Sequence, residues 1–137
     1  MRVANNPLLA PRLWRILLEA GVALAAASAA TQLLPFKRFI RLGALPVRHS
    51  RPLDARELAR IMEALGRRAP FRALCLQQGI ALQWMLRRRG VDAVLHYGMI
   101  LPQGGGDMLA HVWVSVDGEV LLGYRERDGY TEVARYP

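Results

Sequence analysis

Hydrophobic and polar positions follow a helical period in the first two thirds of the chain and a two-residue period in the last third. From Leu13 to roughly Leu34, apolar residues recur at spacings of 3, 4 and 7. A second apolar stripe runs from Asp54 to Leu65, and a third helical stretch runs from Cys75 to about Arg89. Because these spacings place side chains on one face of a helix, the sequence predicts three helices.

Residues that start and stop helices flank the second and third of these segments. Asp54 is expected to act as an N-cap with Glu57 as its reciprocal partner three residues later, and Gly66 is expected to end that helix. Three arginines fill the last turn of the third helix, and Gly90 follows them. Arginines favour the negative end of the helix dipole and glycine favours the position after it, so the arginines need no further role.

After the third helix the pattern alternates, which is typical of strands. One strand is expected from Val91 to Ile100. Two more, Leu109 to Val116 and Glu119 to Leu122, are expected to form a hairpin about the turn Asp117-Gly118. The tail from Tyr124 to Pro137 is expected to add a further strand or ordered edge. Helices followed by an antiparallel sheet predict an α+β fold.

The composition fits one globular unit with a basic N-terminal part. With 137 residues and 53% hydrophobic residues, the chain is long enough for one domain with a core. We expect residues 1–52 to form a helical, basic extension and residues 53–137 to form the core, in one compact unit. Residues 1–53 hold eight basic residues against Glu19 alone. Such a charge suits an anionic membrane surface, nucleic acid or an acidic partner. The sequence has no nucleic-acid-binding motif, so nucleic acid is not expected to bind.

The Ala-rich first helix has three open interpretations. Its apolar run from Gly21 to Ala30 is short for a transmembrane span, and Glu19 lies where such a span would avoid a charge. Arg12 and Arg15 before this run resemble the start of an export signal. A core helix, an interfacial helix with weak membrane-surface association, and an export signal therefore all stay open, with the core helix favoured.

Cys75 is the only cysteine, and it lies where the third helix begins. The unpaired amides and the positive end of a helix dipole stabilise a thiolate, and therefore favour a reactive cysteine. A single cysteine excludes an internal disulfide, which suits a reducing, cytoplasmic compartment. The scattered histidines show no ligand spacing, so neither a metal nor another cofactor is expected. The alternative is an inert packed thiol, because Cys75 shares one helix stripe with Gly79 and Leu82.

His111 is the candidate partner of this thiol, because a cysteine and a histidine together suggest nucleophilic catalysis. On its strand, His111, Trp113 and Ser115 share one face, and three valines share the other. If the cysteine helix packs on the His111 face, the valine face needs cover from the N-terminal helices. His96, on a neighbouring strand, is interpreted as a structural histidine.

Three stretches together resemble a known family: Leu74–Leu82, Leu86–Val91 and Ala110–Gly118. They are similar to the transglutaminase-like leader peptidases of lasso-peptide biosynthesis, over residues 70 to 125. Four features coincide: a cysteine at a helix start, an arginine-rich helix end before R-G-V, an A-H-x-W-V strand and a V-D-G turn. The basic N-terminus, which ends in a P-F-x-R-like segment at Pro35–Arg38, resembles the standalone form of this family.

The resemblance implies a transglutaminase-like, papain-like cysteine peptidase with Cys75 as nucleophile and His111 as general base and acid. Such an enzyme removes the leader from a ribosomal precursor peptide, so that an ATP-dependent cyclase can close the macrolactam on the freed core. In the standalone form, a separate leader-binding protein presents the precursor. We therefore expect three partners: the precursor leader, a leader-binding protein and the cyclase.

The acid that should orient the histidine is the weak point of the resemblance. The family implies an acid about a dozen residues after the histidine, and that position is Gly123. Asp117 is a candidate, although six residues of strand separate it from His111 by about 20 Å. Glu126 is the alternative, and Asp107 and Asp128 would require loops that fold back. Two other readings therefore stay open: an inactive transglutaminase-like scaffold that binds peptide or partner enzymes, and a basic membrane-surface protein.

Overall fold

The computed structural model describes residues 9–47, 55–70, 74–100, 104–107, 109–123 and 129–137. Its elements, in chain order, are α1 (Leu9–Leu33), α2 (Phe36–Phe39), α3 (Ala55–Arg68), α4 (Cys75–Arg88), β1 (Ala93–Ile100), β2 (Leu109–Val116), β3 (Glu119–Leu122) and β4 (Thr131–Tyr136). The strands form one antiparallel sheet in the order β3-β2-β1-β4. The predicted α+β class, the hairpin and the additional C-terminal strand are confirmed.

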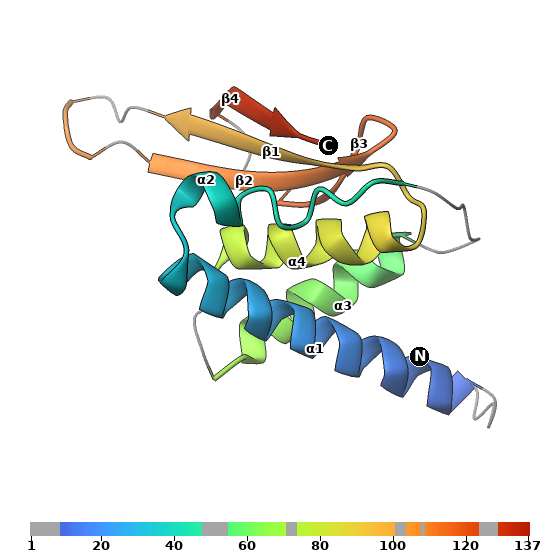
Figure 1. Ribbon diagram of the computed structural model, residues 1–137. Coiled ribbons are helices and arrows are strands. Elements are labelled where there is room, and N and C mark those ends of the chain that lie inside the picture. The colour runs from blue at the N-terminus through green and yellow to red at the C-terminus, as the bar shows by residue number, and fades with distance from the viewer. Residues whose placement is uncertain (1–8, 48–54, 71–73, 101–103, 108, 124–128) are drawn as a thin grey trace.

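The helices all lie on one side of the sheet, and α4 lies directly against it (Figure 1). Helices α1 and α3 pack on α4 from the other side, so α4 is the middle layer of the molecule. Leu82, Met85 and Leu86 of α4 are fully buried, and so are Leu95 and Val114 of the sheet below them. The core therefore lies mainly on the two sides of α4, where apolar surface leaves water.

The turn between β2 and β3 has the backbone that a tight hairpin requires. Asp117 and Gly118 both have positive φ, at 51° and 80°. Two consecutive residues in this region form the turn whose twist matches that of the paired strands, and Asp-Gly is a favoured pair for it. Asp117 is therefore the turn aspartate of the hairpin, exposed to solvent.

The first helix is a core helix on one face and an exposed apolar surface on the other. By length and composition alone, Pro11–Leu33 could cross a membrane, with a mean hydropathy of 1.5. Ala20, Leu24 and Ala27 are nevertheless buried in the protein core, and their small neighbours let α1 lie close to α4. Trp14 and Leu18, in contrast, are 71% and 70% exposed.

The arginines at the end of α4 do more than favour the helix dipole. Arg89 and Arg88 both bind the carboxylate of Glu19 on α1, with Nη1 to Oε1 distances of 2.7 and 3.2 Å. Arg87 is buried and donates from Nη1 to Asp92 and to the carbonyl of Ala93, at 2.6 and 3.2 Å. These bonds join α4 to α1 and to the start of β1, a role that the sequence pattern did not predict.

Helix α3 does not end at Gly66, as predicted, but continues to Arg68. A Cβ at Gly66 would lie 2.2 Å from Nε2 of Gln78 on α4. The glycine therefore serves the close approach of two helices rather than a helix end. The predicted N-cap Asp54 lies outside the described residues.

Helix α4 packs on the valine face of β2, not on the face of His111. A Cβ at Gly79 would lie 2.8 Å from Cγ1 of Val112 and 2.9 Å from Cδ1 of Leu95. The alternative arrangement, in which α4 covers the His111 face and the N-terminal helices cover the valines, is therefore wrong. The valine side chains of β2 are buried under the helices, because burial of apolar surface is favourable. His111 and Ser115 alternate with them along β2 and therefore point away from the helices.

Alanine substitution at two glycines tests this packing. Gly79→Ala should lower the free energy of unfolding, because overpacking a core costs roughly 1–3 kcal/mol and exceeds the gain in helix propensity. Gly21→Ala, in α1 with no atom within 4 Å of its added Cβ, should raise it by about 0.5–1 kcal/mol. Urea unfolding of both variants measures the difference, and equal changes would contradict the close contact at Gly79.

Candidate active site

Cys75 is the first residue of α4, and its side chain is half-buried. The preceding residue, Leu74, has an extended backbone, with φ −77° and ψ −178°. Its N–H donates to Oε1 of Gln77 at 3.1 Å, which closes the first turn of the helix. Amides in the first turn have no partner within the helix, so the N–H of Cys75 is placed to bind a negative oxygen beside the thiol.

Gln77 fixes this end of α4 on the first helix. Its Nε2 donates to Oγ1 of Thr31 at 3.0 Å, and the Thr31 hydroxyl donates to the carbonyl of Ser28 at 2.8 Å. Gln77 is itself buried. Sequence reasoning missed this residue, although a glutamine two residues after the start of a helix is a signal for capping.

His111 is buried on β2 between two aromatic rings. Its ring centroid lies 6.2 Å from that of Trp113 and 5.4 Å from that of Tyr130. Its Nε2 lies 3.3 Å from the carbonyl oxygen of Gly123, which can only accept a hydrogen bond. We therefore assign the proton to Nε2, which leaves Nδ1 with a free lone pair.

The carbonyl of Gly123 occupies the position where the sequence resemblance placed an acid. Gly123 follows β3 and has φ +79°. A Cβ there would lie 2.9 Å from the carbonyl oxygen of Val112 and 3.1 Å from Nε2 of His111. Only glycine therefore fits both the backbone conformation and the close approach to the ring.

The candidate acids are not brought to His111 by the described structure. Asp117 lies in the hairpin turn, and Asp107 is exposed in the loop before β2. Neither forms a hydrogen bond with His111 in the described part of the chain. Glu126 and Asp128 lie outside the described residues.

The helix end that carries Cys75 and the strand end that carries His111 lie toward the same end of the sheet. Gly79 contacts Val112, whereas Gln83, one turn further along α4, donates to the carbonyl of Ala93 at the other end of the ladder. The N-terminal end of α4 therefore points toward the start of β2 (Figure 1). Cys75 precedes Gly79 by one turn, or about 6 Å, and His111 precedes Val112.

Thiol and imidazole can meet only around the edge of β2. Because side chains alternate along a strand, His111 leaves β2 on the side opposite Val112. The pairs that join β2 to β3 end at Val114, and beyond them Gly123 lies against Val112 and His111 at this edge. Among the described residues no hydrogen bond joins Cys75 to His111, and catalytic hydrogen bonds often tighten only when substrate is bound.

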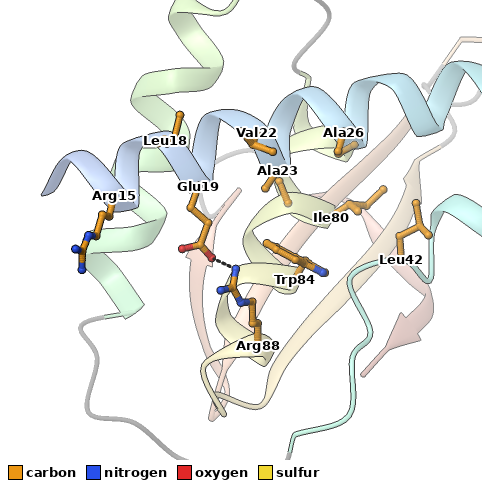
Figure 2. A pocket seen from close by; sticks show the side chains of 12 residues that line it. Arg15, Leu18, Glu19, Val22, Ala23, Ala26, Leu42, Ile80, Trp84 and Arg88 are labelled. Carbon is orange, nitrogen blue, oxygen red and sulfur yellow. Dashed lines mark hydrogen bonds and ion pairs between the residues drawn. The ribbon is translucent and has the colours of Figure 1, made fainter. Parts of the chain in front are cut away.

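A separate apolar hollow of about 610 Å³ lies between α1 and α4 (Figure 2). Ala23 and Trp84 line its floor, and Leu18 and Val22 stand at its α1 side. Glu19 crosses one end and bonds to Arg88. Cys75 is not among the lining residues, so this hollow is distinct from the surroundings of the thiol.

Comparison with known proteins gives the class. A model of the transglutaminase-like superfamily matches residues 17–135. The chain therefore belongs to the transglutaminase-like superfamily, whose members are commonly cysteine peptidases or transferases. The match begins within α1, at residue 17, and so reaches into the segment that we expected to be an extension of the core. No curated protein and no solved structure matches the chain.

Two glycine substitutions test how Gly123 holds the histidine. Gly123→Ala and Gly118→Ala both force alanine to a φ near +80°, at a cost of about 1–2 kcal/mol. Only the Cβ at position 123 meets other atoms; at Gly118 there is nothing within 4 Å. Gly123→Ala should therefore lower the free energy of unfolding, measured in urea, by more than Gly118→Ala does. It should also shift the ring resonances of His111 in NMR spectra. Equal stability losses, with an unmoved His111 signal in both variants, would contradict the contact.

Proposed function

We propose that this protein is a cysteine peptidase that removes the leader from a ribosomally made lasso-peptide precursor. The observation that carries the proposal is that a backbone carbonyl holds His111 near the start of β2, toward which the N-terminal end of α4, with Cys75, points. The superfamily match supports the peptidase chemistry, and the similarity of the cysteine and histidine segments to leader peptidases supports the substrate.

In the proposed mechanism, Nδ1 of His111 takes the proton of the Cys75 thiol. The sulfur attacks the carbonyl carbon of the scissile bond, and the N–H of Cys75 stabilises the resulting oxyanion. His111 then returns its proton to the leaving amine, which departs with the C-terminal part of the substrate. Water, activated by the same nitrogen, releases the leader from the thioester and restores the thiol.

The Gly123 carbonyl performs the orienting role of an acid, but it supplies only a dipole. It fixes the ring and keeps the proton on Nε2, as a carboxylate would. A neutral carbonyl stabilises the imidazolium less than a full negative charge does. We therefore propose that catalysis by this site is slower than it would be with a carboxylate behind the histidine.

We further propose that a separate protein binds the leader, and that the product passes to an ATP-dependent cyclase in the cytoplasm. The described helices α1, α2 and α3 support this proposal, because one face of α1 and the buried residues of α2 and α3 form the core around α4. Phe39 and Ile40, for example, are buried after the short helix α2. These segments therefore offer no separate leader-binding unit among the described residues.

Cleavage of a lasso precursor in the presence of its leader-binding protein tests the function. Mass spectrometry should detect the freed core peptide with the wild-type protein and no product with Cys75→Ala. His111→Gln should lower the rate on the order of 10²–10⁴-fold, because it removes the base. Asp117→Asn should leave the rate unchanged, since asparagine suits the left-handed turn equally well.

The outcomes separate this proposal from an inactive scaffold. Among the described residues, no hydrogen bond joins Cys75 to His111 and no carboxylate bonds to His111, and both observations favour the scaffold. Precursor binding without cleavage by the wild-type protein would support it and would refute the peptidase. A large loss of rate in Asp117→Asn would instead return the orienting role to that carboxylate.

As a second proposal, the protein attaches weakly to an anionic membrane surface. The exposed apolar residues Trp14 and Leu18 of α1 favour this attachment, and so do the exposed cations Arg12 and Arg15. Apolar side chains can enter the headgroup region while cations bind anionic lipid. The protein should float with phosphatidylserine vesicles and be released by salt, but should not float with neutral vesicles. Absence of salt-sensitive flotation would remove this proposal.

A further inference from the structure

A second group of chemically active side chains lies on the face of the sheet that points away from α4, which we call the outer face. His96 of β1 stands at its centre. Its Nε2 lies 2.6 Å from Oγ of Ser115 on β2, and its Nδ1 is bonded to the carboxylate of Glu132 on β4. Three neighbouring strands thus contribute a hydroxyl, an imidazole and a carboxylate in sequence.

The protons of this group are assigned by its partners. The carboxylate can only accept, so Nδ1 carries the proton that it donates to Glu132. Nε2 therefore accepts from the Ser115 hydroxyl. The ring of His96 stacks on Trp113, with centroids 5.4 Å apart and planes 5° from parallel, which fixes its orientation.

Glu132 is held as a carboxylate. Arg135 donates to its other oxygen at 3.0 Å. This hydrogen bond, together with that of His96, holds the pKa of Glu132 below its ordinary value despite partial burial. A charged carboxylate stabilises a proton that moves onto the imidazole.

We propose that Ser115, His96 and Glu132 form a second acyl-transfer site, independent of Cys75, that accepts small carboxylic esters. The order of the groups is nucleophile, base and orienting acid, with the nucleophile hydrogen-bonded to the base and the base to the acid. Cys75 belongs to α4 on the opposite face, whereas His111 of the proposed peptidase site lies on the outer face and packs on the same Trp113 as His96. The two sites therefore use different nucleophiles and different bases.

The reaction balances with these residues and water. The Ser115 oxygen forms a bond to the acyl carbon while its proton moves to Nε2 of His96. The ester's C–O bond breaks, and the alcohol leaves with that proton. Water then attacks the acyl carbon and gives a proton to His96. As the bond between the acyl carbon and Oγ breaks, His96 passes this proton to Oγ, which restores the Ser115 hydroxyl and releases the acid.

A depression of about 440 Å³ lies over these three residues and has room for such a substrate. Val94 and Val120 form apolar parts of its wall, Asp117 adds a negative charge to that of Glu132, and Asp92 is paired with Arg87. The charges disfavour an anionic acyl group, so the substrate class is a neutral or cationic ester. Arg135, also on the wall, has further N–H donors beyond the one bonded to Glu132 and is the candidate partner for the oxyanion.

The test uses the full chain with Cys75→Ala, which removes the other nucleophile. A fluorophosphonate probe should form a bond from phosphorus to Oγ of Ser115, with loss of fluoride and transfer of the proton to His96. Peptide mass spectrometry should locate the adduct at Ser115. Hydrolysis of p-nitrophenyl acetate should fall to the solution rate in the additional variant Ser115→Ala.

Matched variants distinguish the triad from a merely packed hydroxyl. His96→Gln and Glu132→Gln should each lower the labelling rate, by on the order of 10²–10⁴-fold for His96→Gln. Ser28→Ala, which alters a buried serine of α1, should leave labelling of Ser115 unchanged. Circular dichroism checks folding, and Glu132→Gln keeps the test decisive if His96→Gln does not fold. No adduct at Ser115 in the folded protein, or a rate that neither substitution changes, overturns the proposal.

Discussion

The contact between Gly79 of α4 and the valine face of β2 determines where the other parts of the molecule lie. A larger residue would push α4 off Val112 and Leu95, because the space for a Cβ is already filled. With α4 seated there, α1 and α3 can cover its outer side, and the ion pair of Glu19 with Arg89 joins the first and last of these helices. The same contact sets the level of Cys75 relative to His111. Packing of one helix turn thus positions both the core and the helix end that carries Cys75.

The helices and the hairpin could be predicted because each depends on local signals. Alternating valines, the Asp117-Gly118 turn and the apolar stripes encode their own geometry. The role of Gly66 could not be predicted from the sequence. A glycine that ends a helix cannot be told there from a glycine that leaves space for a side chain of another helix, as Gly66 does for Gln78. The sequence analysis did not decide which face of β2 packs on α4. The face with three alternating valines gains the most free energy from burial, and the hydrophobic effect therefore favours it as the face that the helix covers.

Residue type and position in the sequence name Cys75 and His111 as candidates, and their roles stay predictions. The partner of His111 could not be predicted, because a search for an acid examines side chains and the structure uses a main-chain carbonyl. Every residue has such a carbonyl, so it leaves no compositional signal. Its only trace is the glycine that lets the chain pass so close to the ring. The network of His96 was missed for a different reason: its members lie 19 and 36 residues apart along the chain and meet only when β1 lies between β2 and β4.

The carbonyl of Gly123 also has a consequence for how this protein tolerates change. An aspartate behind a histidine is lost when its side chain is substituted, whereas a peptide carbonyl is present in every residue and is displaced only by a change that moves the backbone, such as Gly123→Ala. The orientation of His111 is therefore encoded in the path of the chain at the end of β3 rather than in a functional group. Insertions, deletions or substitutions that bend this path would misorient the ring from a distance. Sequence drift there should be limited by backbone shape, even at positions that never touch a substrate.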